Sequence, residues 1–170
     1  SLGVEYVAHT IRWAKLVGCS RVDTTDDRCR PAGMDDRAAL DHLRRIYGQI
    51  LKVAEAYDVT INIEPHGYYT TNPEFLSEML AFADSPHLRM NMDTGNTFIA
   101  RQDPVAFVER FHDKISHVHV KDVSPTLAAA ARGELTGIAV SQCAIGDGVN
   151  AENIRRCLGL LAQRGYNGVL

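Results

Sequence analysis

Helical and extended sequence patterns alternate along almost the whole of this chain. Five short runs of mainly β-branched and apolar residues each follow a segment in which apolar residues have helical spacing. Such alternation, with short connections, is typical of βαβ units and a parallel sheet, so we expect an α/β fold. The expected strands are Arg21–Thr24, Val59–Glu64, Leu88–Asp93, Ile115–Val120 and Asn167–Leu170.

Capping residues mark the starts of several expected helices. Asn72 and Asp103 each precede a proline, which is the residue favoured at the first position of a helix. Asn150 is expected to cap the last helix, and Gly165 is placed to end it. The expected helices cover Val4–Leu16, Ala38–Ala56, residues 73 to about 83, residues 104 to about 112, and the segment between Asn150 and Gly165.

The segment Val123–Val149 is much longer than the other connections and is rich in alanine and glycine. It follows an expected strand, which is where barrel enzymes carry their functional loops. Within it, Gly146-Asp147-Gly148 resembles a phosphate-binding loop, but we favour a plain turn ahead of Asn150. The sequence has neither of the glycine-rich nucleotide-binding motifs, which argues against a nucleotide-binding doubly wound sheet.

Polar side chains occupy every second position in three of the expected strands. Residues two apart on a strand share a face, so these side chains lie on one side of the sheet. In an open sheet covered by helices on both sides, that face would bury charges at several kcal/mol per unpaired ion. In a closed barrel the same face lines the lumen and reaches the active site. The residues concerned are Asn62, Glu64, Asn91, Asp93, His117 and His119.

This pattern predicts a (β/α)8 TIM barrel. A complete barrel needs eight strands and roughly 250 residues, whereas this chain has 170 residues and about five expected strands. We therefore expect residues 1–170 to form a single domain that is the incomplete C-terminal portion of such a barrel.

Three of the polar side chains are expected to hold a metal ion. Glu64, Asp93 and His119 come from consecutive strand ends and can converge on one point. Carboxylate and imidazole ligands suit one divalent ion, for which we expect Mn²⁺ ahead of Mg²⁺, Co²⁺ and Zn²⁺. Four further residues are candidates for substrate binding, namely His66, Asn96, His117 and Lys121. For each of them, a purely structural role is the alternative.

Composition and net charge argue against some classes of binding partner. The formal net charge is −3 and the isoelectric point about 6.1, so the chain lacks the basic surface of a nucleic-acid-binding protein. It contains no apolar run long enough to span a membrane, and we expect a cytoplasmic protein. The four cysteines form no zinc-binding spacing and are expected to be reduced thiols. Assembly into a homo-oligomer is compatible with this composition.

Three segments resemble the xylose isomerase-like TIM-barrel superfamily. They are Ile63–His66 (IEPH), Met92–Asn96 (MDTGN) and His117–Asp122 (HVHVKD), and their order and spacing extend the resemblance over nearly the whole chain. The superfamily includes ketose 3-epimerases of the tagatose and allulose type, inosose dehydratase and isomerase, hydroxypyruvate isomerase and endonuclease IV. Endonuclease IV has a histidine at the position of Asn96, and this difference, together with the acidic net charge, argues against DNA repair.

The resemblance to the epimerase branch implies one metal ion held by Glu, Asp, His and Glu from the last four strands. The first three map onto Glu64, Asp93 and His119, and the fourth is expected beyond Leu170. Glu64 would also act as an acid/base catalyst on the enediolate that forms when an α-hydroxy carbonyl loses a carbon-bound proton. The side chains expected to orient hydroxyl groups or stabilise the oxyanion are those of His66, His117 and Lys121.

Three functions follow from the resemblance. The first is a metal-dependent isomerase or epimerase that acts on a small sugar or polyol by proton transfer. The second is a lyase or dehydratase that shares the enediolate but expels a β-substituent from a keto-sugar, keto-glycoside or inosose. The third is a non-catalytic sugar-binding subunit, against which the three intact ligand positions argue.

Overall fold

A computed structural model describes residues 2–26, 30–133 and 136–170. Its centre is a parallel four-stranded sheet in which the strands follow one another in sequence order. Because parallel strands all run the same way, their carboxyl ends lie along one edge of the sheet. The strands are β1 (Arg21–Thr24), β2 (Thr60–Ile63), β3 (Leu88–Asp93) and β4 (Ile115–His119).

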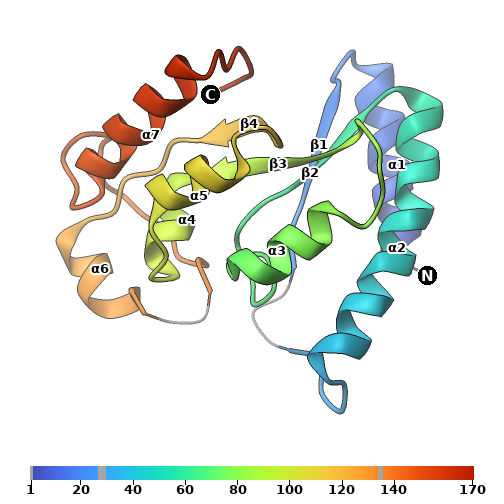
Figure 1. The fold of residues 1–170 in the computed structure, drawn as a ribbon, viewed down its shortest axis with the longest axis horizontal. Helices are drawn as coiled ribbons and strands as arrows, with labels where there is room; N and C mark the ends of the chain where they lie inside the picture. The colour runs from blue at the N-terminus through green and yellow to red at the C-terminus, as the bar shows by residue number, and fades with distance from the viewer. Residues whose placement is uncertain (1, 27–29, 134–135) are drawn as a thin grey trace.

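Helices connect and flank the strands, as Figure 1 shows. Helices α1 and α2 pack side by side next to β1 and β2, whereas α5 and α7 pack together towards the other end of the row of strands. The helices are α1 (Leu2–Leu16), α2 (Asp36–Tyr57), α3 (Pro73–Leu80), α4 (Thr94–Ile99), α5 (Pro104–Phe111), α6 (Pro125–Ala131) and α7 (Ala151–Gln163). Asn72 and Asp103 cap α3 and α5 through their side chains, as expected.

Two helices were not expected from the sequence. Helix α4 begins directly after β3, with Asp93 as its cap, and α6 lies within the long segment Val123–Val149. Ser124 caps α6 by accepting a hydrogen bond from the Leu127 N–H at 3.2 Å. Both helices have fewer than eight residues, which is too short for a periodic apolar pattern to reveal them.

The prediction that Asn150 caps the last helix with its side chain is wrong. Asn150 occupies the N-cap position of α7, but its side chain makes no capping hydrogen bond. Its amide nitrogen instead donates to the carbonyl oxygens of Thr94 and Lys121, at 3.0 and 3.3 Å. Asn150 therefore ties the start of α7 to the carboxyl ends of β3 and β4.

The expected fifth strand is reduced to a single bridge. Val169 forms an isolated parallel bridge with His117, and the Val118 N–H donates to the Val169 carbonyl at 3.0 Å. A strand requires pairing at consecutive residues, which the described segment does not provide. The structure therefore has four strands within its described residues, where the sequence predicted about five.

The two faces of the sheet differ sharply in polarity. The helix-covered face carries the centre of the apolar core, where the side chains of Ile61, Ile63, Met90, Met92 and Val118 are fully buried. The other face carries the polar residues predicted for the lumen. Asp23 lies beside Asn62, and Asp93 lies beside His119, in the register of the parallel pairs.

A bulge in β4 is needed for this arrangement. Met90 pairs with Ile115, but the next residue, Asn91, pairs with His117, so Ser116 is the extra residue. Ile115 is buried in the apolar core on the helix side. Since a one-residue shift moves a strand's side chains to the opposite face, the bulge lets His117 and His119 face the lumen.

Replacement of Met90 by alanine tests the assignment of the core. Met90 is fully buried in the main apolar cluster, so Met90→Ala should leave a cavity and lower the free energy of unfolding by about 2–5 kcal/mol. Val140→Ala, which shortens a side chain that is 84% exposed, is the control and should change stability little. Urea unfolding followed by circular dichroism measures both. Equal stability of the two variants would contradict this packing.

Candidate metal and substrate site

Glu64, Asp93 and His119 come together at the carboxyl edge of the sheet. One oxygen or nitrogen atom from each lies within 4.8 Å of the others. Nδ1 of His119 is 3.5 Å from Oε1 of Glu64 and 3.9 Å from Oδ2 of Asp93. Two carboxylates and an imidazole converging in this way form a donor set suited to a divalent cation.

The backbone that follows β3 fixes the orientation of Asp93. Its Oδ1 accepts hydrogen bonds from the N–H groups of Gly95 and Asn96, at 2.8 and 2.7 Å. This is the capping geometry of α4, and it directs the other oxygen, Oδ2, towards His119. Asp93 therefore has one oxygen that holds the local fold and one that faces the candidate site.

A chain of hydrogen bonds also fixes Glu64. The Asn96 side-chain amide donates to Oε1 of Glu64 at 2.9 Å, and the Lys121 ammonium donates to the side-chain oxygen Oδ1 of Asn96 at 2.7 Å. Lys121 also donates to the Ala139 carbonyl oxygen at 2.6 Å. Gly95 makes this arrangement possible, because a Cβ atom there would lie 2.4 Å from Cγ of Lys121.

Burial is the main influence on the pKa values of the two carboxyl groups, and it raises both. Burial raises the pKa of Glu64, the charge of Asp93 adds to the rise, and His119 opposes it. Burial also raises the pKa of Asp93, against the hydrogen bond from the Asn96 N–H and the charge of Lys121. A divalent cation between the two groups would offset both effects. The residues present therefore fit a metal ion.

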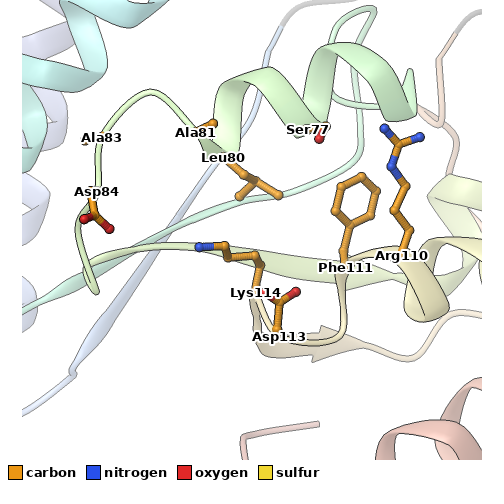
Figure 2. Close-up of a pocket in the computed structure, with 9 residues that line it drawn as sticks. All are labelled: Ser77, Leu80, Ala81, Ala83, Asp84, Arg110, Phe111, Asp113 and Lys114. Atoms are coloured by element: carbon orange, nitrogen blue, oxygen red, sulfur yellow. The ribbon is translucent and has the colours of Figure 1, made fainter.

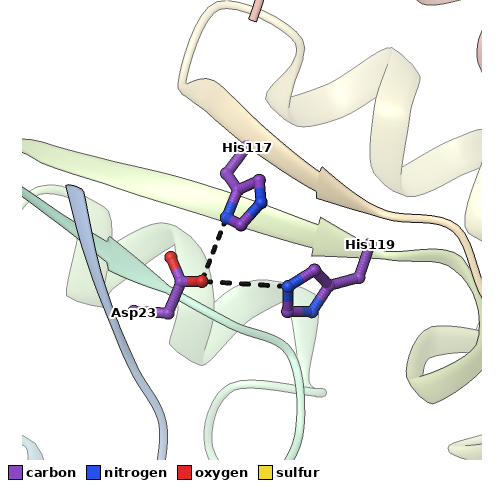
Figure 3. Close-up of side chains that lie close together, drawn as sticks. All are labelled: Asp23, His117 and His119. Atoms are coloured by element: carbon purple, nitrogen blue, oxygen red, sulfur yellow. Dashed lines mark hydrogen bonds and ion pairs between the residues drawn. The ribbon is translucent and has the colours of Figure 1, made fainter. Parts of the chain in front are cut away.

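His117 lies beside this cluster and faces a residue that the sequence reasoning missed. Its Nδ1 is 3.0 Å from Oδ2 of Asp23, and Oδ2 of Asp23 is 3.9 Å from Nε2 of His119 (Figure 3). Asp23, His117 and His119 thus form a second group of close ligand-type atoms that shares His119 with the first. The signal for Asp23 was its position in the first expected strand, two residues after Arg21, with the same polar alternation as in the later strands.

The backbone of His66 takes part in the loops around the site. The His66 N–H donates to the Thr70 hydroxyl at 2.8 Å, and the His66 carbonyl accepts from the Gly137 N–H at 2.8 Å. Asp26, which the sequence reasoning also missed, accepts hydrogen bonds from the Gly67 N–H and the Thr70 hydroxyl. The segment after β2 is therefore held by side chains from the segment after β1.

The glycine-rich turn near Asn150 is occupied by a side chain of the protein itself. The N–H groups of Gly146 and Gly148 donate to Oδ2 of Asp122, at 2.9 and 3.0 Å. Burial would raise the pKa of Asp122, but these and two further backbone hydrogen bonds outweigh it and lower the pKa. Since the Asp122 carboxylate already takes these N–H groups, they do not form a phosphate cradle.

A separate cavity of about 430 Å³ lies between the end of α3 and the segment that joins α5 to β4 (Figure 2). Asp84 and Lys114, which line it, precede β3 and β4 and so belong to the amino ends of these strands. Arg110 in its wall is paired with Glu74. The cavity is therefore at the opposite end of the strands from Glu64, Asp93 and His119.

Comparison with known proteins gives the family. A family model described as a xylose isomerase-like TIM barrel matches residues 2–170. The chain belongs to this family. The barrel fold expected from the sequence is confirmed, and the parallel four-stranded sheet is consistent with part of such a barrel.

The chain is similar to a curated enzyme and to several solved structures. An inosose dehydratase of Clostridium botulinum (strain Eklund 17B / Type B) is 27% identical over 110 residues, which are 61% of this chain and 35% of that protein. The structure of a D-tagatose 3-epimerase-like protein is 25% identical with a TM-score of 0.80, over 99% of this chain and 60% of that one. The IolI protein with a bound zinc atom has a TM-score of 0.77 at 16% identity, over 98% of this chain and 58% of that one.

The coverage values also show how much of each relative this chain matches. The chain spans 35% of the length of the curated relative and about 60% of the epimerase-like structure. Within the described residues, no helix is long and apolar enough to cross a membrane. Cys19, Cys143 and Cys157 are free thiols, as expected, whereas Cys29 lies outside the described residues.

The raised pKa of Glu64 gives a prediction for the cation-free protein. Ionisation of a carboxyl group whose folded-state pKa is raised lowers stability as pH increases from the ordinary range, about 4, through the raised value. Glu64→Gln removes the charge and keeps an oxygen to accept the Asn96 amide. Its melting temperature in EDTA, relative to that of the parent, should therefore increase as the pH rises above about 4.

Thermal unfolding followed by circular dichroism measures this difference. Glu109→Gln, an exposed substitution with the same change in net charge, is the matched control and should show no such trend. Addition of Mn²⁺ should stabilise the parent more than Glu64→Gln, because the variant lacks one charged ligand. A parent protein that is more stable than Glu64→Gln in EDTA at neutral pH would contradict the electrostatic account.

Proposed function

We propose that this protein is a divalent-metal-dependent isomerase or epimerase that acts on a small sugar or polyol by proton transfer. The observation that carries the proposal is the convergence of Glu64, Asp93 and His119 at the carboxyl edge of a TIM-barrel sheet. Active sites of this fold lie at that edge. The 25% identity with a D-tagatose 3-epimerase-like protein supports the choice of reaction.

Glu64, Asp93 and His119 would hold the metal ion. Two carboxylates and one imidazole favour Mn²⁺ in our proposal, with Mg²⁺, Co²⁺ and Zn²⁺ as alternatives. When bound, the ion would supply Lewis-acid stabilisation of the negative charge that develops on the carbonyl oxygen of the substrate. The zinc atom in the IolI structure supports a metal in this fold without identifying the ion for this chain.

Glu64 would move the proton in this reaction. Its carboxylate lies beside the candidate metal position and can accept a carbon-bound proton from a substrate held there. The Asn96 amide holds one oxygen of Glu64 at 2.9 Å and so fixes the direction from which the group approaches the substrate. Lys121 acts on Glu64 through Asn96, and we assign it a supporting role in the pocket.

A dehydratase is the second candidate. It would share the binding of an α-hydroxy carbonyl and the first proton transfer, and would then expel a β-substituent from a keto-sugar, keto-glycoside or inosose. The 27% identity with inosose dehydratase favours this candidate. The same catalytic groups serve both reactions, so the distinction requires an assay. We further propose that the protein acts in the cytoplasm.

Exchange of solvent deuterium separates these candidates. In deuterium oxide with Mn²⁺, an isomerase or epimerase should incorporate deuterium at a carbon next to the carbonyl of its substrate, and EDTA should abolish the exchange. Ketoses, inososes and 3-keto-glycosides are the substrates to screen by mass spectrometry and NMR. Loss of one water molecule instead identifies a dehydratase. Tight sugar binding without exchange or water loss would identify a non-catalytic subunit.

Substitution of the expected ligands tests the metal site. Asp93→Ala and His119→Ala should each lose metal affinity and activity together, because each removes a direct ligand. His117→Ala should weaken metal binding less, by about 10- to 100-fold, if the ring only supports the ligands. Isothermal titration with Mn²⁺ and turnover under the same conditions measure both properties. Equal loss of metal from the two histidine variants would show that His117 is also a ligand.

A further inference from the structure

Asp23 belongs to β1, an edge strand of the sheet, and its side chain contacts side chains from the other three strands. Its Oδ1 accepts a hydrogen bond from the Asn62 amide at 2.9 Å. Its Oδ2 accepts from the Asn91 amide at 3.2 Å and is 3.0 Å from Nδ1 of His117. Asp23, His117 and His119 form one group of close side chains, in which Asp23 is the residue from β1 (Figure 3).

The chemistry of these partners determines where His117 carries its proton. A carboxylate only accepts hydrogen bonds, so each group that bonds to it must be a donor. Nδ1 of His117 therefore carries the N–H that points at Asp23. A neutral imidazole has one N–H, and its other nitrogen is then an acceptor. The acceptor in His117 is Nε2, which lies on the side of the ring away from the Asp23 contact.

One of the two asparagines that donate to Asp23 is itself held in one orientation by a further hydrogen bond. Asn62 is fully buried, and its Oδ1 accepts from the Ser116 hydroxyl at 2.6 Å, which directs its amide nitrogen to Asp23. Asn91 is also fully buried, and its amide nitrogen lies near both Asp23 and the ring of His119. Two buried donors thus hold the Asp23 carboxylate facing His117.

We propose that Asp23 is a positioning residue that keeps His117 in the Nδ1–H form, so that Nε2 accepts a hydrogen bond from a hydroxyl group of the substrate. The claim that the substrate carries hydroxyl groups rests on the proposed function. The claim that His117 carries its proton on Nδ1 is independent of that function. A sugar or polyol offers hydroxyl donors, which an acceptor nitrogen held next to the candidate metal ligands would select. A group without a hydrogen to donate at that position would bind less tightly.

The protonated nitrogen of His117 can be measured directly. In metal-free protein with ¹⁵N-labelled histidine, at about pH 8.5 where an ordinary imidazole is neutral, long-range ¹H–¹⁵N NMR distinguishes the two forms. We expect His117 to carry its proton on Nδ1 in the parent protein. Asp23→Ala should lose this preference, and Asp23→Asn, which keeps one acceptor oxygen, should restore it in part. A parent protein whose His117 is protonated on Nε2 would overturn the proposal without any variant.

Asp84→Ala is the matched control. It makes the same substitution at an exposed carboxylate near the amino ends of the strands, away from Asp23 and His117, so His117 should stay protonated on Nδ1. With the substrate found by the exchange assay, Asp23→Ala should raise KM about tenfold, the worth of one hydrogen bond, and lower kcat less. An unchanged KM in Asp23→Ala would overturn the hydroxyl contact.

The two proposals fail in different ways. If His117 has the expected form, and loses it in Asp23→Ala, but no sugar or polyol is turned over, then the proposed function is wrong and the positioning role of Asp23 stands. If turnover is normal but His117 in the parent is protonated on Nε2, the role of Asp23 is wrong and the proposed function stands.

Discussion

The one-residue bulge at Ser116 is the constraint on which the candidate site depends. Ile115 belongs to the apolar core beside Met90, and strict alternation from it would turn both histidines of β4 towards the helices. The extra residue reverses the alternation, so that His119 lies beside Asp93 and His117 beside Asn91. The bulged Ser116 is itself used, because its hydroxyl holds the buried Asn62 amide.

Electrostatics explains why this polar face can exist inside the protein. Asn62 and Asn91 are fully buried, and their amides donate to the carboxylate of Asp23. Glu64 and Asp93 are less well balanced, since burial raises the pKa of each. Loss of solvation without a matching positive charge is costly, and it persists in proteins mainly at functional sites. The same imbalance that disfavours ionisation here favours the binding of a divalent cation.

Loops from distant parts of the sequence complete the site. Asp26 holds the segment after β2, Asp122 holds the turn before α7, and Lys121 links Asn96 to the segment at Ala139. These contacts join the segments that follow all four strands at one edge of the sheet. A substitution in any one of them can therefore alter the position of Glu64 without touching it.

The sequence by itself determined the order of the four strands and of the longer helices, the polar face of the sheet and the family, and it singled out the three residues that we propose bind metal. These features follow from local periodicity and from motifs within single segments. Only the tertiary structure decided that Asp23 joins His117, that Asn150 spans two strands instead of capping α7, and that Asp122 fills the glycine turn. Each of these contacts joins residues between 24 and 94 positions apart. A local sequence pattern does not predict contacts between residues so far apart in the chain. Such contacts depend on strand register and on the bulge at Ser116, which are set by the packing of the whole sheet.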